Sequence, residues 1–185
     1  MTGHPALVQL LAERSAKQGQ FILASGKRSN FYIDARLTTM SSEGLSIIGP
    51  LGLSTIRELD WGADAVGGLT LGADPISYAI SYASAASDRP LRAFTVRKEA
   101  KTHGTGKLIE GPLRSGDRVV VIEDVITTGD SALRAIEAVR NAKASVSGLM
   151  ALVDREEGGR EAIERTGVNV VSLVTASQII AALTS

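Results

Sequence analysis

At 185 residues, the chain is long enough to bury a substantial core within one domain. Its 20 basic and 20 acidic side chains balance, so composition gives no reason to expect a nucleic-acid-binding or membrane-surface protein. The lack of cysteine excludes disulfides and thiolate metal sites, and no stretch approaches the ~20 apolar residues of a membrane span. We therefore expect one cytoplasmic domain over residues 1–185, with a core of Ala, Val, Ile and Leu.

The first part of the chain predicts a helix, a hairpin and a second helix. Apolar residues at helical spacing follow Pro5, which predicts a helix over 5–17 that ends before Gly19. Residues 21–34 are typical of two short strands around a polar turn at 25–30, and a simple hairpin is the likelier local interpretation. A longer apolar pattern, its start obscured by glycines, predicts a helix over 41–59.

From residue 60 onward, patterns typical of strands and helices alternate. The strands are expected from Ala65 and over 91–96, 119–122, 146–153 and 168–174, and the helices over 76–86, around 133–139, and over 160–165 and 177–183. Such alternation predicts an α/β fold with a mostly parallel central sheet, flanking helices and right-handed crossovers.

The glycine-rich turn after the strand that starts at Ala65 is a candidate anion site. The backbone N–H groups of Leu71 to Ala73 could receive a pyrophosphate. A tight strand-to-helix turn explains the same residues equally well, so both interpretations stay open at this point.

A more specific site is predicted over Arg118–Ser131. The run Val119–Ile122 predicts a strand buried on both faces, and two acids, Glu123 and Asp124, follow at its carboxyl end, where open α/β sheets bind ligands. A small polar loop then opens onto a helix N-terminus and offers hydroxyl and backbone N–H groups to a phosphate; it comprises Val125, Ile126, Thr127, Thr128, Gly129, Asp130 and Ser131. Solvated acids, or a turn with Ser131 as N-cap, would explain either half alone, but the combination is much more specific for phosphate.

A cluster of basic and titratable side chains follows the strand expected at 91–96. It contains Arg97, Lys98, Lys101 and His103, with glycines after it. A charge run is most often a solvated face. This one leaves the carboxyl end of a strand beside the predicted anion site, which favours anion binding. A metal-binding role for His103 is not expected, because the other histidine of the chain, His4, lies in the N-terminal tail.

Three motifs resemble those of a known enzyme family. Four apolar residues, two acids, two apolar residues and Thr-Thr-Gly-x-Ser resemble the phosphoribosyl pyrophosphate (PRPP) motif of type I phosphoribosyltransferases. Arg-Lys-x-x-Lys-x-His-Gly resembles the catalytic loop of orotate phosphoribosyltransferases, and Ser-Gly-x-x-Ser-x-Phe-Tyr-Ile-Asp resembles their N-terminal hood segment. The chain departs from this family at Ala24 and Gly72, where many members have lysine.

The resemblance implies a type I phosphoribosyltransferase fold, with a hood of mainly residues 1–40 and part of 155–185 over a core of about 60–154. It implies transfer of phosphoribose from PRPP to orotate, giving orotidine 5′-monophosphate and pyrophosphate in pyrimidine synthesis, with Mg²⁺ held mainly by PRPP and not by direct side-chain ligation. The implied catalytic residues are Lys101, His103, Glu123 and Asp124. The implied PRPP-binding residues are Arg97, Lys98, Lys101, His103, Glu123, Asp124, Val125, Ile126, Thr127, Thr128, Gly129, Asp130 and Ser131, and the orotate-binding residues are Phe31, Tyr32, Thr127 and Arg155.

The resemblance also implies a homodimer, in which Lys101 and His103 reach across to the acids of the other subunit. Two alternatives are a purine-type phosphoribosyltransferase and a non-catalytic PRPP-binding regulator. The regulator should lack the basic loop and carry an added nucleic-acid surface, and neither condition fits this sequence.

Overall fold

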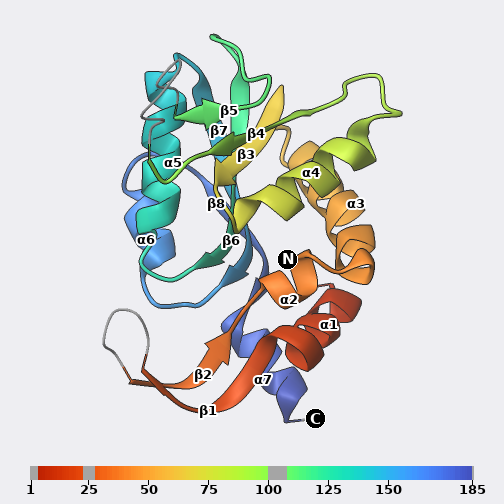
Figure 1. Ribbon diagram of the computed structural model, residues 1–185, viewed down its shortest axis with the longest axis vertical. Coiled ribbons are helices and arrows are strands. Elements are labelled where there is room, and N and C mark those ends of the chain that lie inside the picture. Colours follow the sequence, from red (N-terminus) through yellow and green to blue (C-terminus); the bar gives the residue numbers. More distant parts are fainter. Residues whose placement is uncertain (1–3, 23–27, 100–107, 185) are drawn as a thin grey trace.

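The computed structural model describes residues 4–22, 28–99 and 108–184 (Figure 1). The elements, in chain order, are α1 (Pro5–Ser15), β1 (Ala16–Ile22), β2 (Arg28–Ile33), α2 (Arg36–Thr39), α3 (Ser42–Glu58), β3 (Ala65–Leu69), α4 (Ala73–Ser84), β4 (Arg92–Val96), β5 (Ile109–Glu110), β6 (Arg118–Ile126), α5 (Asp130–Asn141), β7 (Ser145–Asp154), α6 (Gly159–Glu164), β8 (Val170–Thr175) and α7 (Ala176–Leu183). Of the helices in these ranges, none combines the length and apolar composition that crossing a bilayer requires.

The centre of the molecule is a six-stranded sheet in the order β5-β4-β3-β6-β7-β8. All neighbouring strands in it run parallel except the short β5, which pairs antiparallel with β4. The predicted α/β fold with a mostly parallel sheet is therefore confirmed. Because the chain proceeds from β3 to β4 in one direction and from β6 to β8 in the other, the topological switch point lies between β3 and β6.

Helices cover both faces of this sheet, with α3 and α4 on one side and α5 and α6 on the other (Figure 1). Alternate side chains of β6 divide between two cores, as the pleat of a strand requires. Val120 and Ile122 belong to the core that includes Ile48 of α3. Val119 and Val121 belong to the core that includes Ile136 of α5. The β-branched run thus forms a strand buried on both faces, as predicted.

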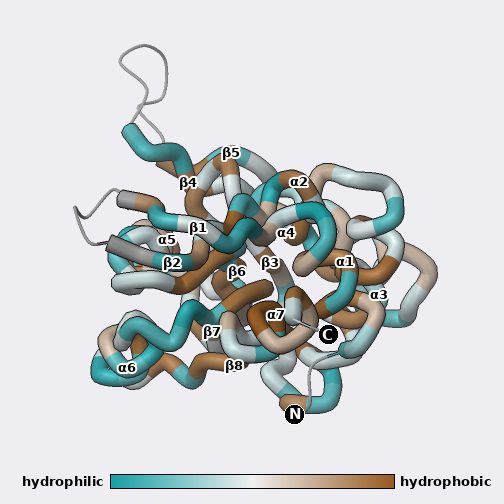
Figure 2. Tube along the Cα trace, turned by 90° about the horizontal axis from the view of Figure 1, so that it is seen from below, coloured by the Kyte–Doolittle hydropathy of each residue, from teal (hydrophilic) through white to brown (hydrophobic). Residues whose placement is uncertain are grey.

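The N-terminal elements α1, β1 and β2 and the C-terminal helix α7 lie at one end of the central sheet (Figure 1). β1 and β2 form the predicted antiparallel hairpin, with Gln18 opposite Phe31. Helix α7, hydrophobic along most of its length in Figure 2, packs against α1. The hairpin carries Tyr32 toward the carboxyl edge of the sheet, and the next residues lead into α2.

Several predicted boundaries are wrong by a few residues. Helix α1 ends at Ser15, two residues early, because Ala16 already pairs with Ile33 in the hairpin. The predicted turn at 25–30 is too long, since β2 begins at Arg28. Helix α4 begins three residues early, at Ala73. No sequence pattern indicates α2 or β5, because both are too short to show a hydrophobic period.

The most consequential difference concerns β6, which was expected to end at Ile122 and instead continues to Ile126. Glu123 pairs with Ala151 and Ile126 with Asp154, because β7 is ten residues long and offers backbone partners along its whole length. The pairing of β6 with β3, in contrast, ends at Val121. The two acids therefore stand on a strand that is paired on one side and open at the switch point on the other.

Candidate active site

A cavity of about 650 Å³ opens at the carboxyl edge of the sheet. Its walls come from the end of β2, the start of α2, the β3–α4 turn, β6 and the loops that follow β4, β6 and β7. The predicted site residues that line it are Tyr32, Lys98, Glu123, Asp124, Val125, Thr127, Thr128, Asp130, Ser131 and Arg155. The fold therefore brings together the acid pair, the polar loop, one residue of the basic cluster and the proposed orotate contacts.

Other predicted residues lie outside the lining of this cavity. Ile126 has its side chain in the core beside α5, so only its backbone is near the loop. Arg97 lies 3.5 Å from Glu110 of β5, with Nη1 and Oε1 as the nearest atoms. Phe31 lies beneath the guanidinium of Arg155, 5.7 Å from its ring centroid. Lys101 and His103 fall outside the described residues, as does Ala24.

The two acids of β6 differ sharply in their environments. Glu123 is only 6 % exposed, and its Oε2 atom has no hydrogen-bond partner among the described residues. Burial raises the pKa of this carboxyl well above its usual range, and the hydrogen bond and charge of Asp124 raise it further. Asp124 is less buried, and its Oδ1 atom accepts the N–H of Val125 at 2.9 Å. The geometry thus presents Asp124 to a ligand, with Glu123 beneath it.

The buried Glu123 should make the stability of the ligand-free protein depend on pH. Because its folded pKa is raised, its contribution is fully present below the unfolded value of 4.5 and is lost as pH rises toward the folded pKa. Glu123→Gln removes this titration, so the variant should gain unfolding free energy relative to wild type as pH rises from 4.5 to 8. Urea unfolding of both proteins at several pH values measures the difference. Glu137→Gln, on the exposed face of α5, is the control, and a Glu123→Gln difference that stays constant with pH would contradict the buried neutral state.

The polar loop after β6 is shaped to expose the N-terminus of α5. Gly129 is the N-cap of this 12-residue helix, not Ser131, and adopts a φ of +88° that favours glycine. A Cβ at this position would also lie 2.9 Å from the carbonyl oxygen of Gly159. Thr128 Oγ1 donates to Asp130 Oδ2 at 2.9 Å, and this hydrogen bond ties the loop to the first turn of α5. Free backbone N–H groups and the helix dipole here suit a phosphate.

The β3–α4 turn forms the opposite wall and is held by a buried aspartate. Asp74 accepts hydrogen bonds from Thr70 at 2.6 Å and from Thr95 at 2.8 Å, so it ties the turn to the end of β4. Gly72 faces Asp124 so closely that a Cβ there would lie 2.4 Å from its carboxylate atoms. A larger side chain at this position would therefore require the Asp124 carboxylate to move.

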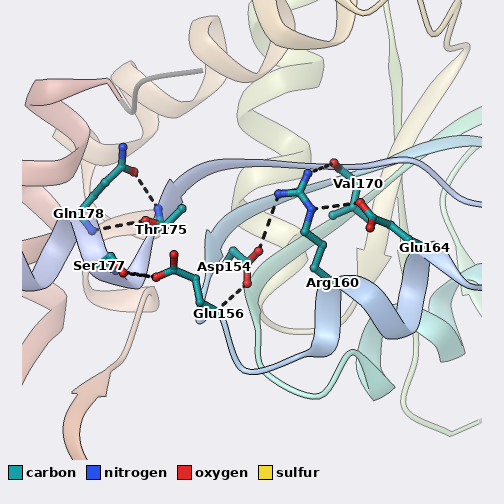
Figure 3. Close-up of polar contacts among 8 residues, drawn as sticks. All are labelled: Asp154, Glu156, Arg160, Glu164, Val170, Thr175, Ser177 and Gln178. Carbon is teal, nitrogen blue, oxygen red and sulfur yellow. Dashed lines mark hydrogen bonds and ion pairs between the residues drawn. The ribbon is translucent and has the colours of Figure 1, made fainter.

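The two chain neighbours of Arg155, Asp154 and Glu156, are anchored by the polar contacts drawn in Figure 3. Asp154 lies 3.9 Å from Arg160 and accepts the N–H of Glu156 at 2.8 Å. The Glu156 carboxylate in turn accepts the N–H of Ser177 at 2.9 Å, at the start of α7. This network fixes the backbone on both sides of Arg155 and links it to the C-terminal helix.

The Arg155 side chain is oriented within the protein and only 7 % exposed. Its Nε donates to Glu157 at 2.7 Å, and its Nη2 donates to the carbonyl oxygen of Phe31 at 3.4 Å. A guanidinium in this position can offer a planar pair of donors to a carboxylate in the cavity. The hairpin residue Phe31 therefore acts through Arg155, while Tyr32 faces the cavity itself.

Sequence reasoning missed two charged residues of the cavity wall, Asp34 and Arg36. They form an ion pair directly after β2, with Arg36 Nε 2.8 Å from Asp34 Oδ1. The available signal was their position, because Asp34 is the last residue of the hood motif and Arg36 follows two residues later. The missed contribution of Asp74 depends on a contact with Thr95, 21 residues away, which no local pattern contains.

Comparison with known proteins gives one consistent result. The family profile described as phosphoribosyl transferase domain matches residues 54–181. The chain is 46% identical over 177 residues to the orotate phosphoribosyltransferase of Aquifex aeolicus, covering 94% of this chain and 96% of the relative.

Solved structures agree. The orotate phosphoribosyltransferase of Mycobacterium tuberculosis in complex with Fe(III) dicitrate has a TM-score of 0.82 at 41% identity, covering 94% of this chain and 97% of the other. The same organism's enzyme in complex with PRPP has a TM-score of 0.77 at 35% identity, covering 96% and 93% of the two chains.

Proposed function

This chain belongs to the orotate phosphoribosyltransferases, within the phosphoribosyl transferase domain family, and we propose that its cavity binds PRPP and orotate together. The enzyme is a pentosyltransferase of pyrimidine biosynthesis that makes orotidine 5′-monophosphate and pyrophosphate. The observation that carries the assignment of sites is the position of the Asp124 carboxylate between the β3–α4 turn and the α5 N-terminus, on the cavity wall.

The proposed binding mode follows from the chemistry of the walls. The 5′-phosphate lies on the backbone N–H groups and hydroxyls of the Thr127–Ser131 loop, at the positive end of α5. The ribose hydroxyls lie on Asp124, with Glu123 behind it, and the diphosphate extends toward the turn at Leu71 and Gly72. Orotate lies against Tyr32, with its carboxylate on the guanidinium of Arg155.

This arrangement explains how the glycosidic bond is exchanged. As the bond from C1′ to the diphosphate breaks, positive charge develops on the ribose ring, and the nearby Asp124 carboxylate stabilises it. Orotate is held on the other side of the ribose, so that its N1 can attack C1′. Lys101 and His103, which lie outside the described residues, are proposed to stabilise the negative charge on the leaving diphosphate. The proposal needs no covalent intermediate.

The donor set of the cavity fits a Mg²⁺ ion that is held mainly by its substrate. Within the described ranges, no group of three or more metal-ligating side chains comes together. Magnesium commonly keeps several waters and binds through one or two carboxylates plus substrate phosphates, a role for which Asp124 is placed. Bound with PRPP, the ion would neutralise the leaving diphosphate.

A homodimer is part of the proposal, and the surface beside the cavity supports it. A second hollow of about 900 Å³ lies between α3 and α4 with an almost wholly apolar lining. Tyr82 on this surface is 85 % exposed, and Met40 and Tyr78 beside it are about half exposed. Leu71 lines both this hollow and the cavity. A second copy on this surface would bury its apolar residues and bring a neighbouring subunit to the site.

The proposal also covers the division of the domain and the cellular location of the protein. The hairpin, α1 and α7 act as a hood, mainly residues 1–40 with part of 155–185, over the catalytic core of about 60–154 within a single 185-residue domain. The protein works in the cytoplasm, where its metabolic relatives are usually placed.

Orotate consumption provides the test of function. With PRPP and Mg²⁺, the wild-type protein should remove the absorbance of orotate and should leave uracil, adenine and hypoxanthine unchanged. Uracil differs from orotate by the carboxylate that Arg155 is proposed to bind, so it is the sharpest control. Equal conversion of a purine base would contradict the assignment.

The variant Arg155→Ala tests the proposed orotate contact in the same assay. Loss of a charge-assisted pair of about 1.5–3 kcal/mol should raise the orotate KM by roughly 10- to 150-fold and leave the PRPP KM nearly unchanged. Glu157→Gln, which removes the partner of Arg155 but keeps the guanidinium, should have a much smaller effect. An increase confined to the PRPP KM would place Arg155 on the phosphate side of the site.

A further inference from the structure

We propose that Arg36 binds the diphosphate of PRPP from the same subunit as the acid pair, and that Asp34 positions it. This inference rests on the proposed function and deepens it, since it adds a diphosphate contact from a residue that the sequence motifs do not contain. Arg36 begins α2 directly after the hairpin and lines the cavity on the side of the β3–α4 turn.

The first support is the fixed geometry of the guanidinium. Arg36 donates to Asp34 through Nε at 2.8 Å and through Nη2 at 2.9 Å, in a forked arrangement. Asp34 Oδ1 also accepts the backbone N–H of Arg36 at 3.2 Å, which ties the acid to the start of α2. Among the contacts within the described ranges, none uses Nη1, and the side chain is 48 % exposed. Asp34 thus orients the guanidinium and leaves its Nη1 group available to a ligand.

The second support is the distribution of positive charge around the cavity. The cationic side chains that line its described part are Arg36, Lys98 and Arg155. Arg155 is engaged by Glu157 and Phe31 at the orotate end, and Lys98 follows β4. The β3–α4 turn, with Thr70, Leu71 and Gly72, has no cation of its own.

The third support is the position of Arg36 relative to this turn and to Asp124. Arg36 and Leu71 line a common groove in addition to the main cavity, so Arg36 lies beside the turn whose N–H groups suit a pyrophosphate. The hydrogen bonds and charge of Asp34 raise the pKa of Arg36, and the charges of Tyr32 and Asp124 contribute less. Arg36 and Asp124, the acid proposed to hold the ribose, line the same cavity. In the proposed binding mode, the bond between the ribose and the diphosphate lies between Asp124 and this turn.

The competing explanation is structural, namely that the Asp34–Arg36 pair only fixes the end of the hairpin. The two explanations differ in which ligands they affect. A diphosphate contact should change the binding of PRPP and of pyrophosphate and spare ligands that lack a diphosphate. A purely structural pair should weaken all ligands together or lower the melting temperature.

The experiment compares Arg36→Gln with wild type by calorimetry of pyrophosphate with Mg²⁺, and by steady-state kinetics. We expect the pyrophosphate Kd and the PRPP KM to rise about tenfold each, which corresponds to about 1.4 kcal/mol. The orotate KM and the inhibition constant of ribose 5-phosphate should stay unchanged. Arg36→Lys should recover part of the loss, and Asp34→Asn should show the same pattern with a smaller effect. Arg57→Gln, on the exposed surface of α3, is the matched control.

Each alternative outcome is informative. Unchanged pyrophosphate binding in Arg36→Gln, or equal weakening of ribose 5-phosphate, would overturn the inference, as would a wild type that does not bind pyrophosphate with Mg²⁺. A change in the oligomeric state of Arg36→Gln would assign the residue to the neighbouring apolar surface instead. A wild type that binds pyrophosphate but does not convert orotate would contradict the proposed function and leave the calorimetric comparison valid.

Discussion

Asp124→Asn should lower turnover by at least about 100-fold, the size of effect expected when one preorganised electrostatic contact to a transition state is removed. The structure places this carboxylate on the cavity wall, against Gly72 and with the N–H of Val125 on its Oδ1 atom. Asparagine has nearly the same shape and can still hydrogen-bond a ribose hydroxyl. It lacks the negative charge that faces the developing cation, so the PRPP KM should change much less than kcat.

The matched control for this prediction is Asp88→Asn. Asp88 is exposed, lies between α4 and β4, and is not part of the cavity lining. Loss of its charge should leave turnover unchanged, because it does not face the ribose. Wild-type turnover in Asp124→Asn, or equal losses in both variants, would remove the electrostatic role assigned to Asp124.

Mixing two inactive variants should restore about a quarter of wild-type activity if the site is shared between subunits. Lys101→Ala and Asp124→Ala are each expected to be nearly inactive alone. In a mixed dimer, one site combines an intact Lys101 from one subunit with an intact Asp124 from the other, and the second site has both lesions. Random pairing makes about half the dimers mixed, so about a quarter of all sites are complete. Activity measured after subunit exchange gives the result directly.

The control pairs two lesions that are assigned to the same subunit's side of the site. Asp124 and Arg155 line one cavity of one chain, so a mixture of Asp124→Ala and Arg155→Ala leaves every site with a lesion and should show no activity beyond that of its Arg155→Ala sites. Recovery in this control would mean that the two residues do not serve one site. No recovery in the first mixture would assign Lys101 to the cavity of its own subunit.

The sequence determined the fold class and the identity of the central strand, because both depend on local patterns. The alternation of strands and helices predicted the parallel sheet, and the run Val119–Ile122 predicted a strand buried on both faces. The polar loop before α5 was predicted to present a helix N-terminus, and the helix begins at Asp130 after the N-cap Gly129. These features follow from hydrophobic patterns and turn residues that are close together in the sequence.

Tertiary structure alone decided what surrounds these elements. The sequence ended β6 at Ile122, whereas pairing with β7 extends it to Ile126 and places Glu123 under Asp124, where burial raises its pKa. The position of the Asp34–Arg36 ion pair beside Leu71 depends on the fold, because the two segments are distant in the sequence. The close approach of Asp124 to Gly72 also depends on the fold, because the two residues belong to different segments of the sheet edge. Strand length, burial and charge partners depend on residues distant in the chain, so no local pattern contains them.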